Sequence, residues 1–249
     1  MQTKIEIAFR RKVRAVWLDQ GLALAAQEVP WAKAKPTLAS EVAADNSGAE
    51  TIRKALEHVR RIWFDSPEVA CALRADALKH FRAYDSQTTR RLLNWGMAIA
   101  CYPFVGSVAE ACGRLLKLQS EANRADIQRR LREQHGDRDF VNRITRYNIS
   151  SFLDWNIIAE SKKRGTYTLG KPIKAHNPTL LAWLAEAVLI SRGRTQMGFS
   201  ELSNHPALFP IALDAVNASV LQNNPRFHVE RQSLNQEFVF LDAVKASTK

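Results

Sequence analysis

The stretch DFVNRITRYNISSFLDWNIIAESKKRGTYTLG, residues 139–170, decides the fold in the middle of this chain. In its first half, apolar and small polar side chains recur at steps of three and four residues, which predicts a helix with one buried face. The predicted inward positions are Val141, Ile144, Thr145, Asn148, Phe152 and Trp155. Asp137 or Asp139 can cap the start of this helix. On the opposite side lie Asn142, Arg143, Arg146 and Ser150, so we expect a polar and cationic outer face.

The second half of the stretch predicts a β-hairpin. NIIAE and GTYTLG, residues 156–160 and 165–170, read as two strands. The turn between them carries three consecutive cations, Lys162, Lys163 and Arg164, directly before Gly165. Such a turn is either a solvated loop tip or a surface that meets nucleic-acid backbone, and what precedes it decides between the two.

Two further helices are predicted before this stretch. SVAEACGRLLKLQS, residues 107–120, has an apolar stripe, and ANRADIQRRLREQHG, residues 122–136, forms a shorter helix that Gly136 ends. Three helices followed by a two-stranded ribbon is the order of a winged helix-turn-helix. In that fold the third helix enters the major groove, while the ribbon, or wing, touches the adjacent backbone.

The flanking regions also have mainly helical spacing. We expect helices over residues 48–64, from Pro67 with Ser66 as N-cap, and from Ser86 to about Cys101, where Pro103 stops the helix. A helix-turn-helix at residues 37–63 is a weaker alternative reader, with outward residues Thr51, Arg53, Lys54 and Arg60.

The pattern of the central region recurs near the C-terminus. Residues 177–194, 198–210 and 214–224 predict three helices, and residues 226–242 alternate through Phe227, Val229, Phe238 and Phe240 about a polar turn. The third of these helices has no Lys or Arg, so we interpret this unit as a packing or dimerisation copy. We therefore expect a mainly α fold of helical bundle units with winged helix-turn-helix-like domains and short β-hairpin wings, divided into 1–103, 104–175 and 176–249.

The charge distribution favours a polyanionic partner. The 249-residue chain has a formal net charge of +11 and a pI near 9.9. Residues 114–174 hold 14 Lys and Arg against 7 Asp and Glu, whereas the other 188 residues hold 22 against 18. Because binding to duplex DNA draws on phosphate neutralisation by clustered cations, this asymmetry is more informative than the total.

The sequence gives little support for catalysis or metal binding. The six His residues are scattered, the three Cys residues form no C-x-x-C pair, and no phosphate-binding glycine loop or nucleophile elbow is present. We expect a protein that is not an enzyme, with no catalytic residues, no metal and no cofactor. The longest apolar stretch, near residues 95–105, is too short to span a bilayer, so we expect no membrane contact and a soluble, unprocessed, cytoplasmic protein.

Residues 92–160 resemble the core of the BrxA family, small proteins of bacterial BREX phage-defence systems, and the resemblance extends over about residues 50–172. The motifs that carry it are YPF at residues 102–104, GRLL at 113–116, RRL at 129–131 near GDR at 136–138, and DW at 154–155. The resemblance implies an all-helical protein with small helix-turn-helix-like domains that binds double-stranded DNA and works with other BREX proteins. The family usually has glycine after DW, and this chain has Asn156, which also tolerates left-handed backbone.

These observations define a predicted DNA-binding set. Cations of the second helix and of the wing would hold phosphate, and the third helix would read bases. The set is Arg124, Arg129, Arg130, Arg138, Asn142, Arg143, Arg146, Lys162, Lys163, Arg164 and Lys171. Two alternatives stay open, a protein adaptor in a defence complex and an RNA-binding factor. The sequence leaves homo-oligomerisation open as well.

Overall fold

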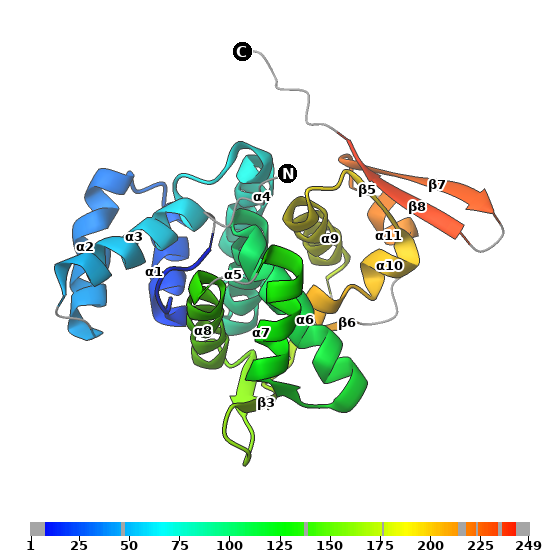
Figure 1. Cartoon of the computed structure of the whole chain (residues 1–249). Helices are drawn as coiled ribbons and strands as arrows, with labels where there is room; N and C mark the ends of the chain where they lie inside the picture. Colours follow the sequence, from blue (N-terminus) through cyan, green and yellow to red (C-terminus); the bar gives the residue numbers. More distant parts are fainter. Residues whose placement is uncertain are drawn as a thin grey trace.

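The computed structural model describes residues 8–45, 48–136, 139–175, 177–213, 218–222, 224–233 and 236–242. Within them the protein is mostly helical, with three small sheets (Figure 1). The α-helices are α1 (Ala15–Ala26), α2 (Trp31–Asp45), α3 (Ala49–Trp63), α4 (Cys71–Ala83), α5 (Gln87–Cys101), α6 (Pro103–Gln119), α7 (Arg124–His135), α8 (Asp139–Asp154), α9 (Pro178–Arg192), α10 (Phe199–Ser203) and α11 (Ser219–Gln222). The mainly α expectation is therefore confirmed.

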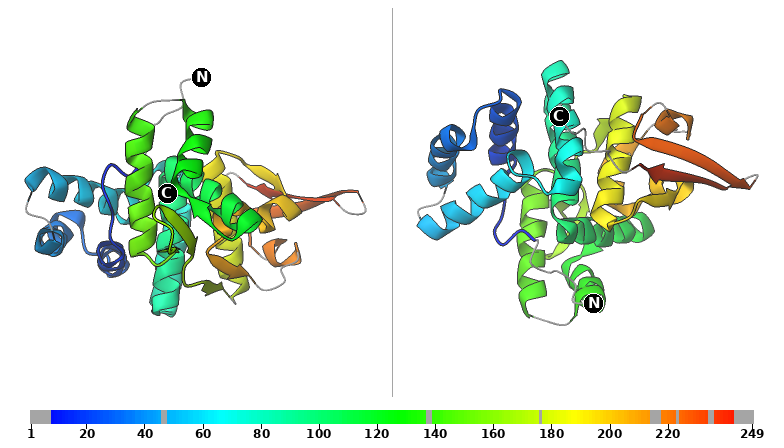
Figure 2. Two further views of the ribbon diagram at one scale, coloured as in Figure 1. Left: turned by 60° about the horizontal axis from the view of Figure 1, so that its bottom comes forward. Right: turned by 90° about the horizontal axis from the view of Figure 1, so that it is seen from above.

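Strands and 3₁₀ turns connect these helices. The strands are β1 (Ala122–Asn123), β2 (Ile158–Glu160), β3 (Thr166–Leu169), β4 (Ile173–Ala175), β5 (Gln196–Gly198), β6 (Ile211–Leu213), β7 (Phe227–Ser233) and β8 (Gln236–Leu241). The 3₁₀ turns are η1 (Glu68–Ala70) and η2 (Pro206–Leu208). Helices α1 to α3 and the β7–β8 hairpin lie at opposite ends of the molecule (Figure 2).

The helix boundaries near the centre follow local chemistry. Ser86 Oγ accepts a hydrogen bond from the Thr89 backbone N–H at 3.1 Å, and α5 begins directly after this cap. Helix α5 ends at Cys101, and α6 begins at Pro103 after a bend of 115°. Proline disfavours helical backbone in the residue before it, which explains the break at Tyr102.

The predicted N-cap at Ser66 is wrong. Its Oγ instead donates to the Ile62 carbonyl oxygen at 2.9 Å, back into the end of α3. The chain then forms the 3₁₀ turn η1, and α4 starts only at Cys71. A serine next to a helix end can bond in either direction, so its identity alone did not choose the cap.

We call residues 103–169, from α6 to β3, the central unit. All six predicted inward positions of α8 are buried, at 5% relative exposure or less. The hairpin is also as predicted, since β2 pairs antiparallel with β3, and β1 adds a third strand to give the order β1-β3-β2. Gly136 ends α7 with φ 88°, and Asn156 follows α8 with φ 54°, the left-handed backbone that asparagine was expected to tolerate.

We call residues 178–241, from α9 to β8, the C-terminal unit. Its strands β5, β8 and β7 form an antiparallel sheet in that order, and β4 and β6 form a separate parallel pair. The predicted hairpin is present, but its aromatic residues divide between two faces. Val229 pairs with Val239, whereas Phe238 pairs with Glu230 and so lies on the other side of the sheet. Val239 is the fully buried residue of β8, a position that the predicted alternation had passed over.

One contiguous hydrophobic core joins these regions. Helix α5 runs through it, with every residue from Leu92 to Cys101 buried. The C-terminal unit packs closely on α6, because a Cβ at Gly113 would lie 2.0 Å from the Pro206 carbonyl oxygen. The predicted boundaries after residues 103 and 175 remain predictions. Across the described ranges no single helix is long and apolar enough to cross a bilayer; the bent pair of α5 and α6 meets that test only when taken together.

Candidate nucleic-acid interface

The outer face of α8 is cationic, as predicted. Arg143 and Arg146 are exposed, and the Arg143 guanidinium lies 5.5 Å from the Phe140 ring centroid. Asp139 lies one turn before Arg143 on the same helix, but within the described residues neither arginine forms an ion pair. Both side chains therefore keep their charge available on the surface.

Asn142 is less available than the two arginines. Its side chain is half-buried, and its Oδ1 is buried without a hydrogen-bond partner in the described part of the chain. Its backbone oxygen accepts from Gln128 Nε2 of α7 at 3.2 Å. With 100° of rotation per residue, Asn142 lies 40° from Arg146 and 100° from Arg143, at the edge of their stripe, and its bond with Gln128 places this edge against α7.

The hairpin turn presents two of its three cations freely. Thr166 N–H donates to the Lys163 carbonyl at 3.0 Å and closes the turn, and Gly165 has φ 74°, a backbone that glycine adopts without strain. Lys163 Nζ lies 3.7 Å from Glu121 Oε2. Lys162 and Arg164 are exposed and make no ion pair with a described residue.

Arg124 connects α7 to this hairpin. Its backbone N–H donates to the Gly165 carbonyl at 2.8 Å. Its side chain is exposed, and burial raises the pKa of Tyr167 although the Arg124 charge acts in the opposite direction. The first turn of α7 and the hairpin tip are thus held together.

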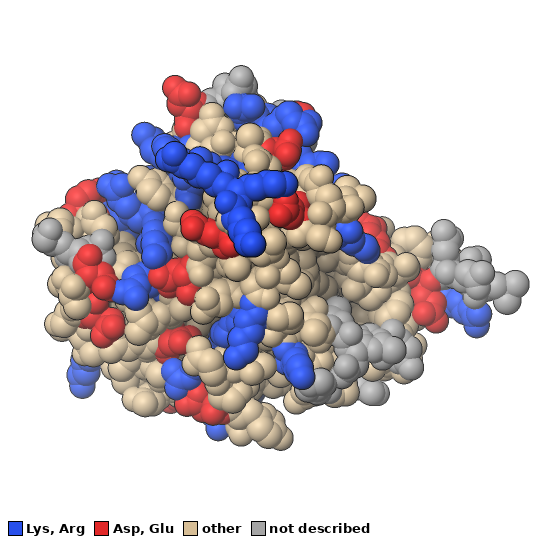
Figure 3. Space-filling view, turned by 90° about the horizontal axis from the view of Figure 1, so that it is seen from below, with Lys and Arg blue, Asp and Glu red and all other residues tan. Residues whose placement is uncertain are grey.

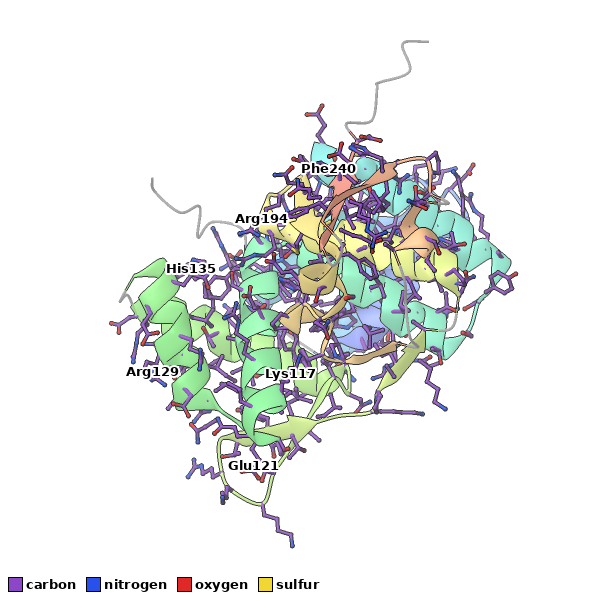
Figure 4. The ribbon with its side chains drawn as sticks, turned by 90° about the vertical axis from the view of Figure 1, so that its right-hand side faces the viewer. Lys117, Glu121, Arg129, His135, Arg194 and Phe240 are labelled. Atoms are coloured by element: carbon purple, nitrogen blue, oxygen red, sulfur yellow. The ribbon has the colours of Figure 1, made fainter. Side chains whose placement is uncertain are left out.

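The other predicted arginines of α7 differ from Arg124. Arg129 is exposed but paired with Asp126 at 3.2 Å and with Glu133 at 3.4 Å, and hydrogen bonding to Asp126 raises its pKa. Arg130 is half-buried, and its Nε has no hydrogen-bond partner among the described residues. Figure 4 shows α7 running from near Glu121, beside the hairpin, to His135 at its far end, with Arg129 between them.

Lys171 and Arg138 are the last two residues of the predicted DNA-binding set. The carbonyl oxygens of Lys171 and Asn156 accept from Arg91 Nη2 at 2.7 and 3.0 Å, so Arg91 fastens the base of the hairpin. The Lys171 side chain itself is exposed. Arg138 lies outside the described residues.

Five exposed cations of α7, α8 and the hairpin turn therefore have no carboxylate partner among the described residues. We call this set the cationic face, and its members are Arg124, Arg143, Arg146, Lys162 and Arg164. Seen from below, Lys and Arg side chains gather across the upper centre of the molecule (Figure 3). The face combines α7, α8 and the hairpin.

Helix α3 belongs to the alternative helix-turn-helix at residues 37–63, and its outward cations are paired with acidic residues. Arg53 is held between Glu50 and Glu57, and Lys54 also binds Glu50 at 2.9 Å. Hydrogen bonds from Arg53 and Lys54 lower the pKa of Glu50 to about 2. Arg60 pairs with Asp65 at 3.1 Å. The outward cations of α3 are thus already neutralised, which favours the central unit over residues 37–63 as the anion-binding surface.

Titratable groups elsewhere are mostly packing groups. Burial raises the pKa of Cys101 and Cys112 to about 12, and it lowers the pKa of His58 to about 3. Among the described residues, no group of three or more His, Cys, Asp or Glu is placed to hold a metal ion.

Sequence reasoning overlooked one basic segment beside α8. Residues 9–14, FRRKVR, carry four cations and no acid, and Arg11 Nη1 donates to the Tyr147 hydroxyl of α8 at 2.9 Å. Phe9 and Val13 are fully buried. Two apolar anchors spaced among arginines were the available signal, because cations in a merely solvated tail would need no such anchors.

Comparisons with family models, with curated proteins and with solved structures found no match to this chain. The resemblance to the BrxA family therefore rests on the sequence motifs quoted above.

Proposed function

We propose that this protein binds double-stranded DNA without catalysing a reaction and acts as a component of a BREX-type phage-defence system. The DNA-binding part rests on the cationic face, and the assignment to a defence system rests on the resemblance to the BrxA family. The other BREX proteins are the proposed protein partners, and the proposed compartment is the cytoplasm.

The observation that carries the DNA proposal is that the five cations of the cationic face have no carboxylate partner within the described ranges. Affinity for duplex DNA comes largely from the release of counterions when protein cations neutralise phosphates. Cations already paired within the protein must first break those pairs, so unpaired and clustered cations bind phosphate at lower cost. Arg53, Lys54 and Arg60 of α3 do not meet this condition.

The arrangement of the central unit supports a winged helix-turn-helix mode of binding. Helices α6, α7 and α8 are followed by the β2–β3 hairpin, and the 16-residue helix α8 exposes Arg143 and Arg146. In this mode α8 would enter the major groove, and the hairpin would contact the adjacent backbone. Arg124 holds the hairpin tip to α7, so the wing would meet DNA in one fixed position.

The contacts divide by role. Arg143 and Arg146 are the proposed base readers, because guanidinium groups pair with two acceptors of guanine in the major groove. Lys162, Arg164 and Arg124 are the proposed phosphate contacts, which fix register without reading sequence. Arg129, Arg130, Lys163 and Lys171 are secondary, since the structure pairs, partly buries or sets them apart. Asn142 contributes only if its side chain turns away from α7.

A titration by fluorescence anisotropy tests the proposal. The protein is mixed with a random duplex of about 30 base pairs at several salt concentrations, and the affinity is plotted against salt. We expect a steep salt dependence, which Lys162→Ala with Arg164→Ala reduces by up to about two units of slope. Lys33→Ala with Lys35→Ala on α2 removes the same charge from exposed positions and serves as the matched control.

The result separates the candidate functions. If the wild-type protein does not bind duplex DNA even at low salt, the DNA proposal is wrong. Competition by an RNA duplex that exceeds competition by DNA would favour the RNA-binding alternative.

A protein-docking role is the second candidate, and one surface feature favours it. A hollow of about 490 Å³ between α6 and the C-terminal unit is lined mainly by apolar side chains, including Leu169, and Lys117 stands at its edge (Figure 4). Leu169 and the nearby Leu118 of α6 are exposed apolar residues. Co-purification with the other BREX proteins, compared between wild type and Leu118→Glu, tests this role.

A further inference from the structure

Residues 9–14, which we call the arginine segment, are held in place along α8. The Val13 N–H donates to Ser151 Oγ at 2.8 Å, and the Val13 carbonyl accepts from Trp155 Nε1 at 2.9 Å. The Ala15 N–H donates to Asp154 Oδ1 at 2.8 Å just beyond the segment. Residues of α8 and the adjoining Trp155 therefore fix the backbone of this non-helical stretch at three successive points.

The other end of the segment is fixed to α3. The Arg10 N–H donates to His58 Nε2 at 3.2 Å, and the Phe9 ring packs between His58, Tyr102 and Trp155. Phe9 and Val13 point into the core with no exposed surface. The cations between and beside them are consequently presented to the outside from a rigid support.

The segment borders the base-reading stripe of α8. Tyr147, which accepts the hydrogen bond from Arg11, follows Arg146 by one residue and lies 100° around the helix from it. Asn142 marks the opposite flank, where α7 packs. The Arg143 and Arg146 stripe is thus bounded by α7 on one side and by the arginine segment on the other.

Two of the four cations in the segment have no carboxylate partner in the described part of the chain. Lys12 and Arg14 pair with Asp154, and Arg14 also pairs with Asp45. Arg10 is exposed, and Arg11 is held by the Tyr147 hydroxyl and the face of its ring, with 5.7 Å to the centroid. Arg10 also lines a hollow of about 350 Å³ together with Arg61, Arg60, Asp65 and Glu57, so acidic side chains balance the positive ones on that side.

We propose that the arginine segment is a second phosphate-binding element, which contacts the backbone of the same duplex on the flank of α8 opposite α7. This inference rests on the proposed function. A helix seated in the major groove has a phosphate strand on each side of it, and α7 with the hairpin serves only one of them. The segment places unpaired guanidinium groups where the other strand would run, and its three backbone anchors remove the entropy cost of ordering a flexible tail on binding.

Paired charge-removal variants test the inference. Arg10→Gln with Arg11→Gln removes the two unpaired cations, and Lys33→Gln with Lys35→Gln on α2 removes equal charge from another exposed surface. We expect the first variant to weaken duplex binding about threefold to tenfold and to lower the salt slope by up to about two units, whereas the second leaves both near wild type. Arg10→Lys with Arg11→Lys keeps the charge and should retain most of the slope.

The outcomes separate this inference from the proposed function. If wild type binds duplex and the Lys162/Arg164 variant loses slope, but the Arg10/Arg11 variant does not, the arginine segment is not a contact and the central unit still is. A loss equal to that of the Lys33/Lys35 control means that only net charge matters, which also overturns the inference. If wild type fails to bind, both proposals fall.

A structural effect of the substitutions must be distinguished from a lost contact. Tyr147→Phe keeps the ring and removes the hydroxyl that positions Arg11, so we expect a smaller loss of affinity with the charge unchanged. Thermal unfolding of each variant shows whether the fold is intact. Loss of slope in a variant that unfolds like wild type supports the inference, and loss that occurs only together with a lowered unfolding temperature contradicts it.

Discussion

The central and C-terminal units have the same strand topology and opposite surface chemistry. In both, a short strand after the first helix pairs with the second strand of a later hairpin, which gives the orders β1-β3-β2 and β5-β8-β7. Within the described residues, the central unit has unpaired cations on its third helix and hairpin turn, whereas α11 carries no cation. The difference shows that a shared arrangement of elements does not itself define a DNA reader, and that the side chains on the third helix and the turn do.

The third helices differ most. Helix α8 has 16 residues and two exposed arginines, whereas α11 has four residues, Ser219–Gln222, and no cation. The outer face of the C-terminal hairpin carries a stacked pair, His228 on Phe240, with ring centroids 4.7 Å apart. This hairpin serves mainly in packing, because Arg226, directly before β7, forms ion pairs with Glu186 of α9 and Asp76 of α4.

The substitution with the largest expected effect tests whether α8 recognises DNA bases, a role that we do not assign to the C-terminal unit. Arg143→Ala with Arg146→Ala should cost about 1 to 3 kcal/mol of binding free energy for each base-reading contact. The measurement is the affinity for a selected site and for random duplexes. A uniform loss across all sequences would mean that these arginines touch only phosphate.

The next prediction concerns Arg226, which fastens the C-terminal unit. Glu186 is 2% exposed, and burial raises its pKa even though Arg226 acts to lower it. Arg226→Ala leaves this carboxylate without its partner, so the free energy of unfolding should fall by about 3 kcal/mol, measured in urea. Adding Glu186→Gln should recover part of the loss. DNA affinity at a temperature where the variant is folded should stay near wild type, and a collapse of affinity there would show that the C-terminal unit takes part in binding.

His58 supports the arginine segment, a feature without a counterpart in the C-terminal unit. Its pKa is lowered from 6.5 to about 3 by burial, so the unfolded chain binds a proton that the folded chain does not. Stability should therefore fall as pH drops below 6.5, by about 2 kcal/mol between pH 7 and pH 5. Urea unfolding of wild type and His58→Gln at both pH values measures the difference. Parallel pH dependence in the two proteins would show that His58 is not responsible.

The smallest expected effect is on the C-terminal unit itself. Arg194→Ala with Arg231→Ala removes two cations from this unit, and we expect the salt slope of duplex binding to change by less than about half a unit. The Lys162/Arg164 variant, measured in parallel, provides the contrast. A slope reduced as much as in that variant would mean that the C-terminal unit also contacts DNA and that the two units do not differ in this respect.

Sequence patterns predicted α8 and its hairpin well, because both depend on local periodicity. The inward set from Val141 to Trp155 is buried, and the cationic turn closes at Gly165. Prediction was weaker where a residue had two local options. Ser66 bonds backward instead of capping α4, and Phe238 faces away from Val229 because hairpin register, not alternation alone, fixes the inner face.

Local sequence patterns predicted only part of the candidate site. Its exposed cations follow from the outer positions of α8 and from the turn. Which of them are free does not follow, since Arg129 meets Asp126 and Glu133 on its own helix and Lys163 meets Glu121 from before α7. The arginine segment was missed because its anchors, Ser151, Trp155 and His58, lie more than 45 residues away along the chain.

The sequence by itself determined the helices of the central unit, the two hairpins and the concentration of charge in residues 114–174, because these depend on neighbours within a few residues. Only the tertiary structure decided which cations stay unpaired, which face of each hairpin is buried, and which distant segments border α8. Ion pairs, strand register and long-range hydrogen bonds depend on distances between residues far apart in sequence. Those distances exist only once the common core has brought α3, α8 and the arginine segment together.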